Sequence, residues 1–219
     1  MKSKKNRIKK LPKASVHIED LSGMEDEDLL EMFVRGEQLA FNVLLARYKR
    51  PLMGFIFRFL QDREASEDIF QETYLKIIKN AATFKGQSRF KTWLFKIARN
   101  LCIDRLRHLG VLTMVSADQP LSGDDGASIL DRLQSPAMGP LDEVEQHNLV
   151  SRIEAVLTDV PIEQREVFIL RAVLDMPFAE IAHVTGVSEN TVKSRMRYAM
   201  EGLRKRLADL GAQSASEAR

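Results

Sequence analysis

One stretch of this chain, residues 176–206, limits its fold more than any other feature. Pro177 suits the first turn of a short helix, because its missing N–H would be unpaired there in any case. Gly186 lies where a tight turn needs a positive φ, and Ser188 is a good N-cap for the helix that follows. A short helix, a glycine turn and a second helix predict a helix-turn-helix, whose second helix can enter the major groove of DNA.

The second helix of this motif divides into an apolar stripe and a polar face. The stripe recurs every three or four residues and is predicted to face the core: Val192, Met196, Ala199 and Leu203. The polar face lies away from it and carries Asn190, Lys193, Ser194, Arg197 and Glu201. An ordinary helical hairpin with a solvated basic face is the alternative to a DNA-binding motif.

Charge is unevenly distributed along the 219 residues, although the formal net charge is only +2. Residues 1–13 and 85–108 are strongly basic, whereas residues 110–148 are acidic apart from Arg132. Such segregation predicts separate partners for separate segments. No apolar run approaches the ~20 residues that span a bilayer, so we expect no membrane insertion.

The sequence lacks the patterns of an enzyme or a metalloprotein. It contains no P-loop and no nucleophile–base pair, and its four histidines are scattered without the spacing of metal ligands. We therefore expect no catalytic residue, no metal and no cofactor. Cys102 is the only cysteine, which excludes an intrachain disulfide and favours a cytoplasmic location. Its apolar helical flanks predict a small buried residue.

Helical periodicity covers the first half of the chain. Apolar side chains recur at three and four residues over four segments, 26–35, 37–60, 64–78 and 89–108. Pro51 is expected to divide or kink the second segment, and residues 79–88 are expected to form a loop. Ile77 and Ile78 are both placed on the buried face of the third segment. The apolar stripe of the fourth segment comprises Phe90, Trp93, Leu94, Ile97, Ala98, Leu101 and Cys102. Trp93 is therefore predicted to belong to the core.

The second half begins after a break in this periodicity. Residues 109–140 are dominated by Gly, Pro, Ser and Asp, which predicts a flexible acidic linker. Helical pattern then resumes before the helix-turn-helix, where a helix is marked by Val144, Leu149, Ile153, Val156 and Leu157. No strand pattern is present. The chain is therefore predicted to be all-α, with two small helical domains that fold independently. Residues 1–25 are expected to form a flexible basic tail and residues 211–219 a disordered one.

The helix predicted over residues 64–78 has an acidic face opposite its apolar face. Together with Asp62, two residues before the helix, this face carries Glu64, Glu67, Asp68, Gln71 and Glu72. Acids near a helix N-terminus suit the helix dipole, and that alone would explain them. Their density also makes a patch that a basic partner can meet. Both interpretations remain open at this point.

Two segments together resemble the sigma-70 family of transcription initiation factors. The run DREASEDIFQETYLKII, followed by FKGQSRFKTWLFKIARNLCIDRLR, resembles the second conserved region of that family. The helix-turn-helix, with VPIEQREVFILRAVLDMPFAEIA before it and TVKSR inside it, resembles the fourth. A short acidic linker replaces the domain that larger members carry between these regions, as in the extracytoplasmic-function (ECF) group.

The resemblance implies a non-catalytic subunit that binds core RNA polymerase, recognises two promoter elements and promotes strand opening. Region 2 would span residues 26–108 and region 4 residues 141–210. The residues implied in binding core polymerase are Asp68, Gln71 and Glu72. An anti-sigma factor is implied as a further partner, and the location is cytoplasmic, associated with the nucleoid when bound to polymerase.

The resemblance also implies two sets of DNA contacts. The minus-ten set comprises Lys79, Asn80, Phe84, Lys85, Ser88, Arg89, Lys91, Lys96, Arg99 and Asn100. The minus-thirty-five set comprises Ser188, Glu189, Asn190, Thr191, Lys193, Ser194, Arg195 and Arg197. Lysine and arginine suit guanine edges or phosphates. Arg197-Tyr198 departs from the common family pattern of an aromatic or His followed by Arg, which affects the promoter sequence and not the fold.

Two alternatives stay open. Phe84 either stacks on an unpaired base or covers the core beneath its loop. The whole chain is either a sigma factor or a stand-alone helix-turn-helix regulator, which would leave residues 26–108 unexplained.

Overall fold

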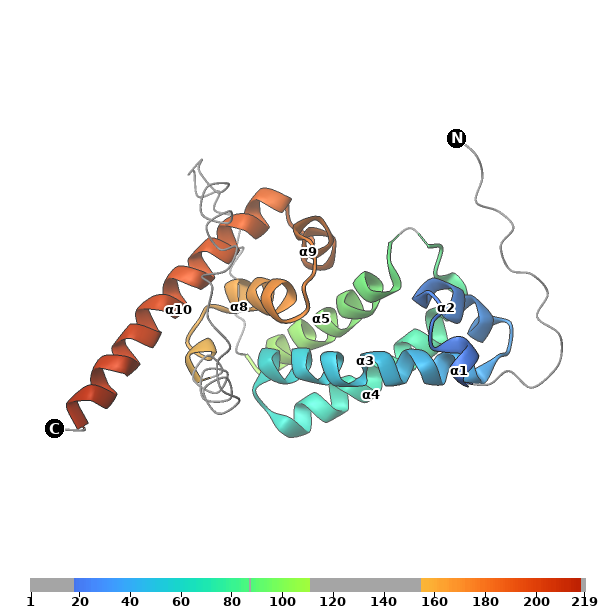
Figure 1. The fold of residues 1–219 in the computed structure, drawn as a ribbon, viewed down its shortest axis with the longest axis horizontal. Helices are drawn as coiled ribbons and strands as arrows, with labels where there is room; N and C mark the ends of the chain where they lie inside the picture. The colour runs from blue at the N-terminus through green and yellow to red at the C-terminus, as the bar shows by residue number, and fades with distance from the viewer. Residues whose placement is uncertain (1–17, 87, 111–154, 218–219) are drawn as a thin grey trace.

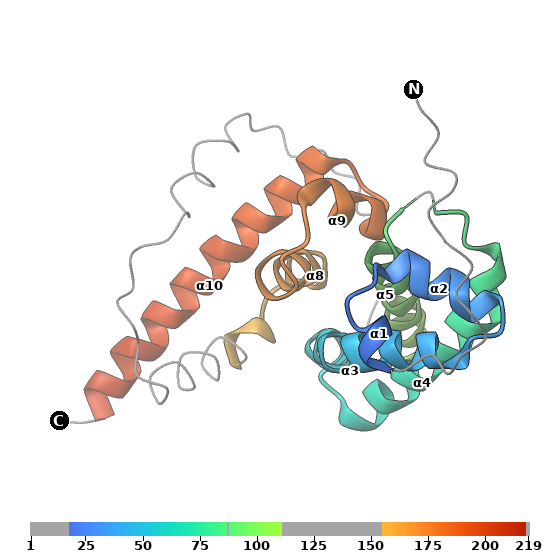
Figure 2. The same ribbon diagram turned by 45° about the vertical axis from the view of Figure 1, so that its right-hand side comes forward.

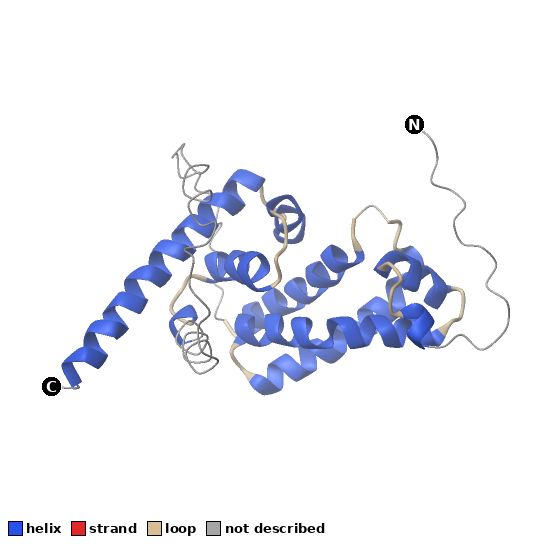
Figure 3. Cartoon of the chain, in the orientation of Figure 1, coloured by secondary structure: helices blue, strands red, loops and turns tan. Residues whose placement is uncertain are grey.

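The computed structural model describes residues 18–86, 88–110 and 155–217. Every regular element in these ranges is helical, and no strand occurs in them, so the all-α prediction is confirmed (Figure 3). The greater part of the linker predicted over residues 109–140 lies outside the described ranges. So does most of the helix expected from residue 144 onward. We call residues 18–110 the N-terminal half and residues 155–217 the C-terminal half.

The N-terminal half is built around three long helices (Figure 1). Two short helices, α1 (Ile18–Leu21) and α2 (Asp26–Val34), precede them. The long ones are α3 (Gln38–Leu60), α4 (Arg63–Asn80) and α5 (Phe90–His108), with a 3₁₀ turn at Ala81–Thr83 after α4. Their apolar stripes meet in one core, as the helical periodicity predicts.

Side chains fix where these helices begin. The Asp62 carboxylate accepts a hydrogen bond of 2.8 Å from the Ala65 N–H at the start of α4. Glu27 of α2 reaches across the chain, and its Oε1 accepts a hydrogen bond of 2.6 Å from the backbone N–H of Phe90. A carboxylate at this position also suits the positive end of the α5 dipole. Glu27 therefore ties α2 to the start of α5, next to the loop that carries part of the predicted minus-ten set.

Two local expectations for the N-terminal half are corrected: the division of α3 at Pro51 and the extent of the N-terminal tail. Helix α3 is not divided at Pro51, because the buried residues before and after it, such as Tyr48 and Leu52, form one continuous stripe. Their packing outweighs the ~3 kcal/mol that an interior proline costs a helix. The tail predicted through residue 25 is already helical at Ile18–Leu21, because the Leu21 side chain is buried in the core.

The C-terminal half contains the helix-turn-helix. Helix α8 (Ile162–Phe168) continues into a π-helical turn (Ile169–Val173), followed by α9 (Phe178–Thr185) and α10 (Glu189–Glu217). The disordered tail predicted from residue 211 is wrong as far as Glu217. Helix α10 continues there to its end at Glu217.

The local geometry of the helix-turn-helix matches its sequence signals. Gly186 has a φ of +76° at the C-cap of α9, a conformation that favours glycine. The Ser188 Oγ accepts a hydrogen bond of 3.1 Å from the Thr191 N–H at the start of α10. The predicted apolar stripe of this helix is buried throughout: Val192, Met196, Ala199 and Leu203.

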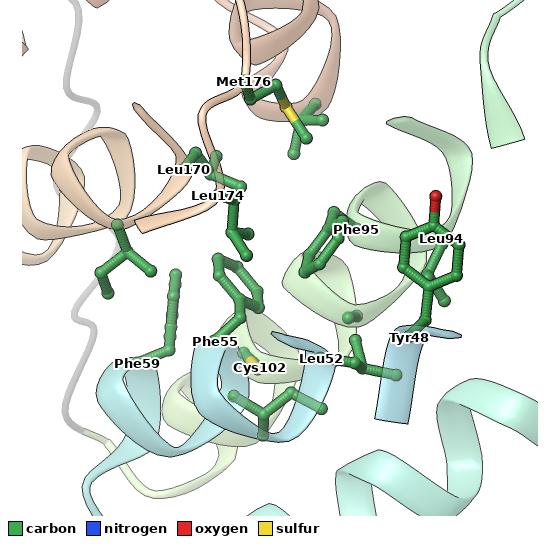
Figure 4. Packing of buried hydrophobic residues seen from close by; sticks show 14 of the residues in the cluster. Tyr48, Leu52, Phe55, Phe59, Leu94, Phe95, Cys102, Leu170, Leu174 and Met176 are labelled. Carbon is green, nitrogen blue, oxygen red and sulfur yellow. The ribbon is translucent and has the colours of Figure 1, made fainter. Parts of the chain in front are cut away.

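The two halves also pack against each other, which the sequence did not predict. Helices α8 and α9 lie between α10 and the N-terminal half (Figure 2), and α9 contacts α5. One cluster of buried apolar residues extends across the junction. Figure 4 shows Phe55 and Phe59 of α3 and Phe95 of α5 on one side, with Leu170 and Leu174 of the C-terminal half on the other.

The junction gives a first prediction. Phe95 is fully buried, and its ring packs edge-on against Phe55 with a centroid distance of 5.4 Å. We expect Phe95→Ala to lower the free energy of unfolding by about 3–5 kcal/mol, through lost burial and the cavity left behind. Urea denaturation followed by circular dichroism measures this. Phe57→Ala, on the exposed side of α3, is the matched control and should cost less than about 1 kcal/mol. Equal losses would contradict the placement of Phe95.

Candidate protein- and nucleic-acid-binding surfaces

The acidic face of α4 lies open to solvent. Asp68, Gln71 and Glu72 are exposed, whereas Ile69 and Ile77 on the other side of the helix are buried. Lys76 Nζ lies 3.5 Å from a Glu72 carboxylate oxygen. This exposed pair contributes little to the free energy of folding. The three predicted polymerase-binding residues therefore share one accessible surface.

Two apolar side chains on α4 extend this surface, and sequence reasoning missed both. Leu75 is 66% exposed and Ile78 is 45% exposed. Ile78 was expected to be buried, but only Ile77 reaches the core, since residues 77 and 78 point about 100° apart around a helix. The sequence did hold one sign of an exposed apolar side chain on α4, because Leu75 is an apolar residue within an otherwise polar face. Exposed apolar side chains rimmed by polar residues are a feature of protein-docking surfaces.

The loop before α5 carries Phe84, whose role the sequence left open. Phe84 is partly buried, and its ring centroid lies 5.1 Å from that of Trp93. Trp93 itself is only partly buried and packs against Phe90. Phe84 thus covers the core beneath the loop while one side stays accessible. A hollow of about 300 Å³ lies beside it, bordered by Glu27, Leu30, Ala81 and Gly86 among others.

The predicted minus-ten residues fall into two groups. Most are accessible in whole or part on α4, the loop and the outer side of α5: Lys79, Asn80, Phe84, Lys85, Ser88, Arg89, Lys96 and Asn100. Lys91 and Arg99 instead make hydrogen bonds to the C-terminal half, and the exposed Arg89 also places its Nε 3.5 Å from a carboxylate oxygen of Glu180 there. Lys91 Nζ donates a hydrogen bond of 2.6 Å to the Leu174 carbonyl oxygen. Arg99 is 18% exposed, and its guanidinium donates two hydrogen bonds to Glu166.

Glu166 of α8 is the most deeply buried acid among the described residues, with 1% of its side chain exposed. The Arg99 Nε–Oε2 distance is 2.8 Å, and Arg195 of α10 places a guanidinium nitrogen 3.6 Å from Oε1. Burial raises the pKa of the Glu166 carboxyl, while the hydrogen bonds and charge of Arg99, then the charge of Arg195, act against this rise. One carboxylate therefore joins cations from both predicted DNA-binding sets.

The predicted minus-thirty-five residues occupy the start of α10, where their accessibility differs. Ser188, Glu189 and Asn190 are exposed, and Thr191, Lys193, Ser194, Arg195 and Arg197 are partly buried. Lys193 pairs with Glu189 at 2.9 Å, and 38% of its side chain is exposed. Arg195 is only 15% exposed and faces Glu166. Arg197 lies over the Tyr198 ring at 4.9 Å and donates to its hydroxyl.

Metal binding, membrane insertion and thiol reactivity find little support in the described part of the chain. No group of three or more His, Cys, Asp or Glu side chains there is arranged to hold a metal ion. Among the same residues, no helix is long and apolar enough to cross a membrane. Cys102 is buried as predicted, and burial raises the pKa of its thiol, which disfavours the reactive thiolate.

Family models match both halves of the chain. Residues 44–110 match the model of sigma-70 region 2, and residues 151–203 match that of sigma-70 region 4. The ECF RNA polymerase sigma factor SigW of Bacillus subtilis is 30% identical over 176 residues, which cover 80% of this chain and 93% of SigW. The RNA polymerase sigma-H factor of Pseudomonas aeruginosa is 29% identical, with 87% of this chain and 97% of that protein covered.

Solved structures show the same fold. CnrH, determined in complex with the cytosolic domain of CnrY, matches with a TM-score of 0.60 and 23% identity, covering 84% of this chain and 97% of CnrH. The sigma factor RpoE of Bartonella quintana, co-crystallised with the anti-sigma factor NepR, matches with a TM-score of 0.56 and 23% identity. It covers 77% of this chain and 96% of RpoE.

The burial of Glu166 gives a second prediction. We expect Glu166→Ala to destabilise the protein by about 3–5 kcal/mol, because Arg99 and Arg195 would keep their burial and lose their counter-charge. Glu163→Ala on the same helix removes a partly exposed carboxylate and should cost less than about 1 kcal/mol. Thermal and urea unfolding of both variants measure the difference. A Glu166→Ala protein as stable as wild type would show that this carboxylate is not a structural counter-ion.

Proposed function

This chain belongs to the sigma-70 family of RNA polymerase sigma factors, in its ECF group, and from this premise we propose which of its surfaces carry out each step. As a sigma factor it binds core RNA polymerase and recognises promoter DNA. A stand-alone helix-turn-helix regulator would not account for the region 2 match over residues 44–110. We assign polymerase binding and the minus-ten element to residues 26–108, and the minus-thirty-five element to residues 141–210.

We propose that the α4 surface docks on core polymerase. The supporting observation is the exposure of Asp68, Gln71 and Glu72 on one side of a helix whose other side is buried. Exposed acids of this kind attract a basic partner and fix its orientation. An exposed apolar neighbour such as Leu75 adds apolar surface that is removed from water when the partner binds. The surface therefore combines charge complementarity with a small apolar anchor.

We propose that the loop and α5 bind the minus-ten element and promote strand opening. The accessible cations Lys79, Lys85 and Arg89 can follow the backbone of a single strand. Phe84 has one side accessible beside the hollow, where an unpaired base could stack. Its contact with Trp93 keeps the ring in place beneath such a base.

We propose that the start of α10 lies in the major groove at the minus-thirty-five element, where N-terminal residues of a recognition helix meet base edges. The buried stripe of α10 leaves only its polar side available to DNA. On that side Lys193 is held by one exposed partner, Glu189, and such a pair is easily exchanged for a nucleic-acid contact. We assign to Lys193 the leading role in this set.

We propose three further properties that the family carries. Sigma factors are not enzymes, and we assign no catalytic activity to this chain. Sigma factors act with cytoplasmic RNA polymerase, and we place this protein in the cytoplasm, on the nucleoid when bound to polymerase. RpoE of Bartonella quintana, a structural relative, was solved with an anti-sigma factor, and we propose that this chain also has such a partner.

The polymerase surface gives a third prediction. We expect the double variant Asp68→Lys, Glu72→Lys to bind core polymerase more weakly by about 2–5 kcal/mol, because it reverses two charges that face a basic partner. Fluorescence titration of labelled protein with core polymerase measures the affinity. The control, Glu201→Lys with Asp209→Lys, makes the same change of charge on exposed positions of α10 and should bind normally. The assignment fails if both variants bind core polymerase equally well.

The recognition helix gives a fourth prediction. We expect Lys193→Ala to weaken promoter binding by the reconstituted holoenzyme by about 1–3 kcal/mol and to relax preference at one position of the upstream element. A pure phosphate contact would instead weaken binding to all sequences alike and reduce the salt slope by about one. Lys205→Ala, at an exposed site farther along α10, is the control. Binding indistinguishable from wild type at two salt concentrations would exclude Lys193 from the DNA interface.

A further inference from the structure

The guanidinium of Arg197 is held against the side chain that follows it on α10. Its Cζ lies 4.9 Å from the centroid of the Tyr198 ring, and its Nη2 donates a hydrogen bond of 3.1 Å to the Tyr198 hydroxyl. The face of an aromatic ring attracts a cation, and the hydrogen bond fixes the direction of the guanidinium plane. Both side chains are partly buried. The two contacts therefore restrict a side chain that otherwise has many rotamers.

Arg197 differs from Lys193 and Arg195 in its charge partners. Lys193 pairs with Glu189, and Arg195 faces the buried Glu166. In the part of the chain that the structure describes, Arg197 has no carboxylate within ion-pairing distance, and its partner is the neutral Tyr198 side chain. An arginine in this state breaks no ion pair when it meets DNA, so its whole charge is available for the contact.

The order of residues 197 and 198 decides which side of α10 carries the guanidinium. Lys193 and Arg197 are four positions apart, so they lie about 40° apart around the helix axis and about 6 Å apart along it. An arginine at position 198 would point about 100° away from this face. The common family order is an aromatic or His followed by Arg, and this chain has the reverse. The reversal places a second cation beside Lys193, on the side proposed to enter the major groove.

The donors of Arg197 fit one base edge in particular. A guanidinium has five N–H groups, and the Tyr198 hydroxyl accepts from one of them. The other donors can form two parallel hydrogen bonds to O6 and N7 of guanine, a pair of acceptors that no other base presents in the major groove.

We propose that Arg197 reads a guanine of the minus-thirty-five element, and that Tyr198 is the positioning residue that holds Arg197 for this contact. This inference rests on the proposed function of α10. The guanine lies about two base pairs from the position that Lys193 contacts, because 6 Å along the helix corresponds to about two steps of 3.4 Å in B-form DNA.

The test uses the reconstituted holoenzyme and a pool of duplex promoter fragments randomised over the upstream element. Sequencing of the bound fraction gives the base preference at each position, and binding at two salt concentrations gives the salt slope. We expect Arg197→Ala to lower the preference for guanine at one position about tenfold. Arg197→Lys should lower the same preference and leave the salt slope unchanged, because lysine keeps the charge and loses the planar fork.

Two changes at Tyr198 test the positioning role. Tyr198→Phe keeps the ring and loses the hydroxyl, and we expect it to lower the same guanine preference about threefold while all other positions keep theirs. In the Arg197→Ala background the same change should have no further effect, since the two side chains act as one unit. The exchange Arg197→Tyr with Tyr198→Arg keeps composition and charge but turns the guanidinium about 100° away. It should lose the guanine preference as fully as Arg197→Ala does.

The outcomes separate this inference from the function on which it rests. An exchange variant with the wild-type preference, or a Tyr198→Phe change that lowers all positions alike together with the melting temperature, overturns the proposed pair. So does an Arg197→Ala protein with unchanged preferences when Lys193→Ala still relaxes one position, and in that case α10 remains the recognition helix. Unchanged preferences in both Lys193→Ala and Arg197→Ala would instead contradict the assignment of α10 to the upstream element.

Discussion

Helix α5 is packed on two sides, and the positions of both candidate DNA-binding surfaces depend on this packing. On one side Leu94, Ala98 and Cys102 complete the core of the N-terminal half. On the other, Thr92 and Arg99 contact the C-terminal half through hydrogen bonds. Because protein interiors are close-packed, α5 cannot shift without disturbing its contacts with both halves. The orientation of the minus-ten residues is therefore set by the whole molecule.

Two cations of α10 that are equivalent candidates in the sequence differ in how deeply they are buried. Lys193 and Arg195 lie two positions apart on α10, and each has an acidic partner. An exposed pair such as Lys193–Glu189 contributes about 0.3–0.5 kcal/mol, so DNA phosphate competes with it easily. Arg195 is only 15% exposed and faces a carboxylate that is 1% exposed and shared with Arg99, so moving it to DNA would break a buried interaction. Arg195 is therefore better suited to positioning the recognition helix than to contacting DNA.

The sequence predicted the features that depend on local patterns and missed those that depend on contacts across the chain. Gly186, Ser188 and the stripe from Val192 to Leu203 lie as the helix-turn-helix pattern requires. The roles of Glu166 and Glu180 could not be found in this way, because their partners lie 67 and 88 residues away. Phe95 fell outside the predicted stripe of α5 for the same reason. Its burial comes from a junction that helical periodicity does not describe.

An ion pair gives the junction a property that apolar packing alone would lack. A buried carboxylate tolerates the loss of one guanidinium better when a second one stays beside it, because its charge remains compensated. Arg195 plays this part for Glu166 beside Arg99, since a nitrogen of each guanidinium lies within 3.6 Å of the carboxylate. The same carboxylate that joins the halves is therefore compensated from both of them.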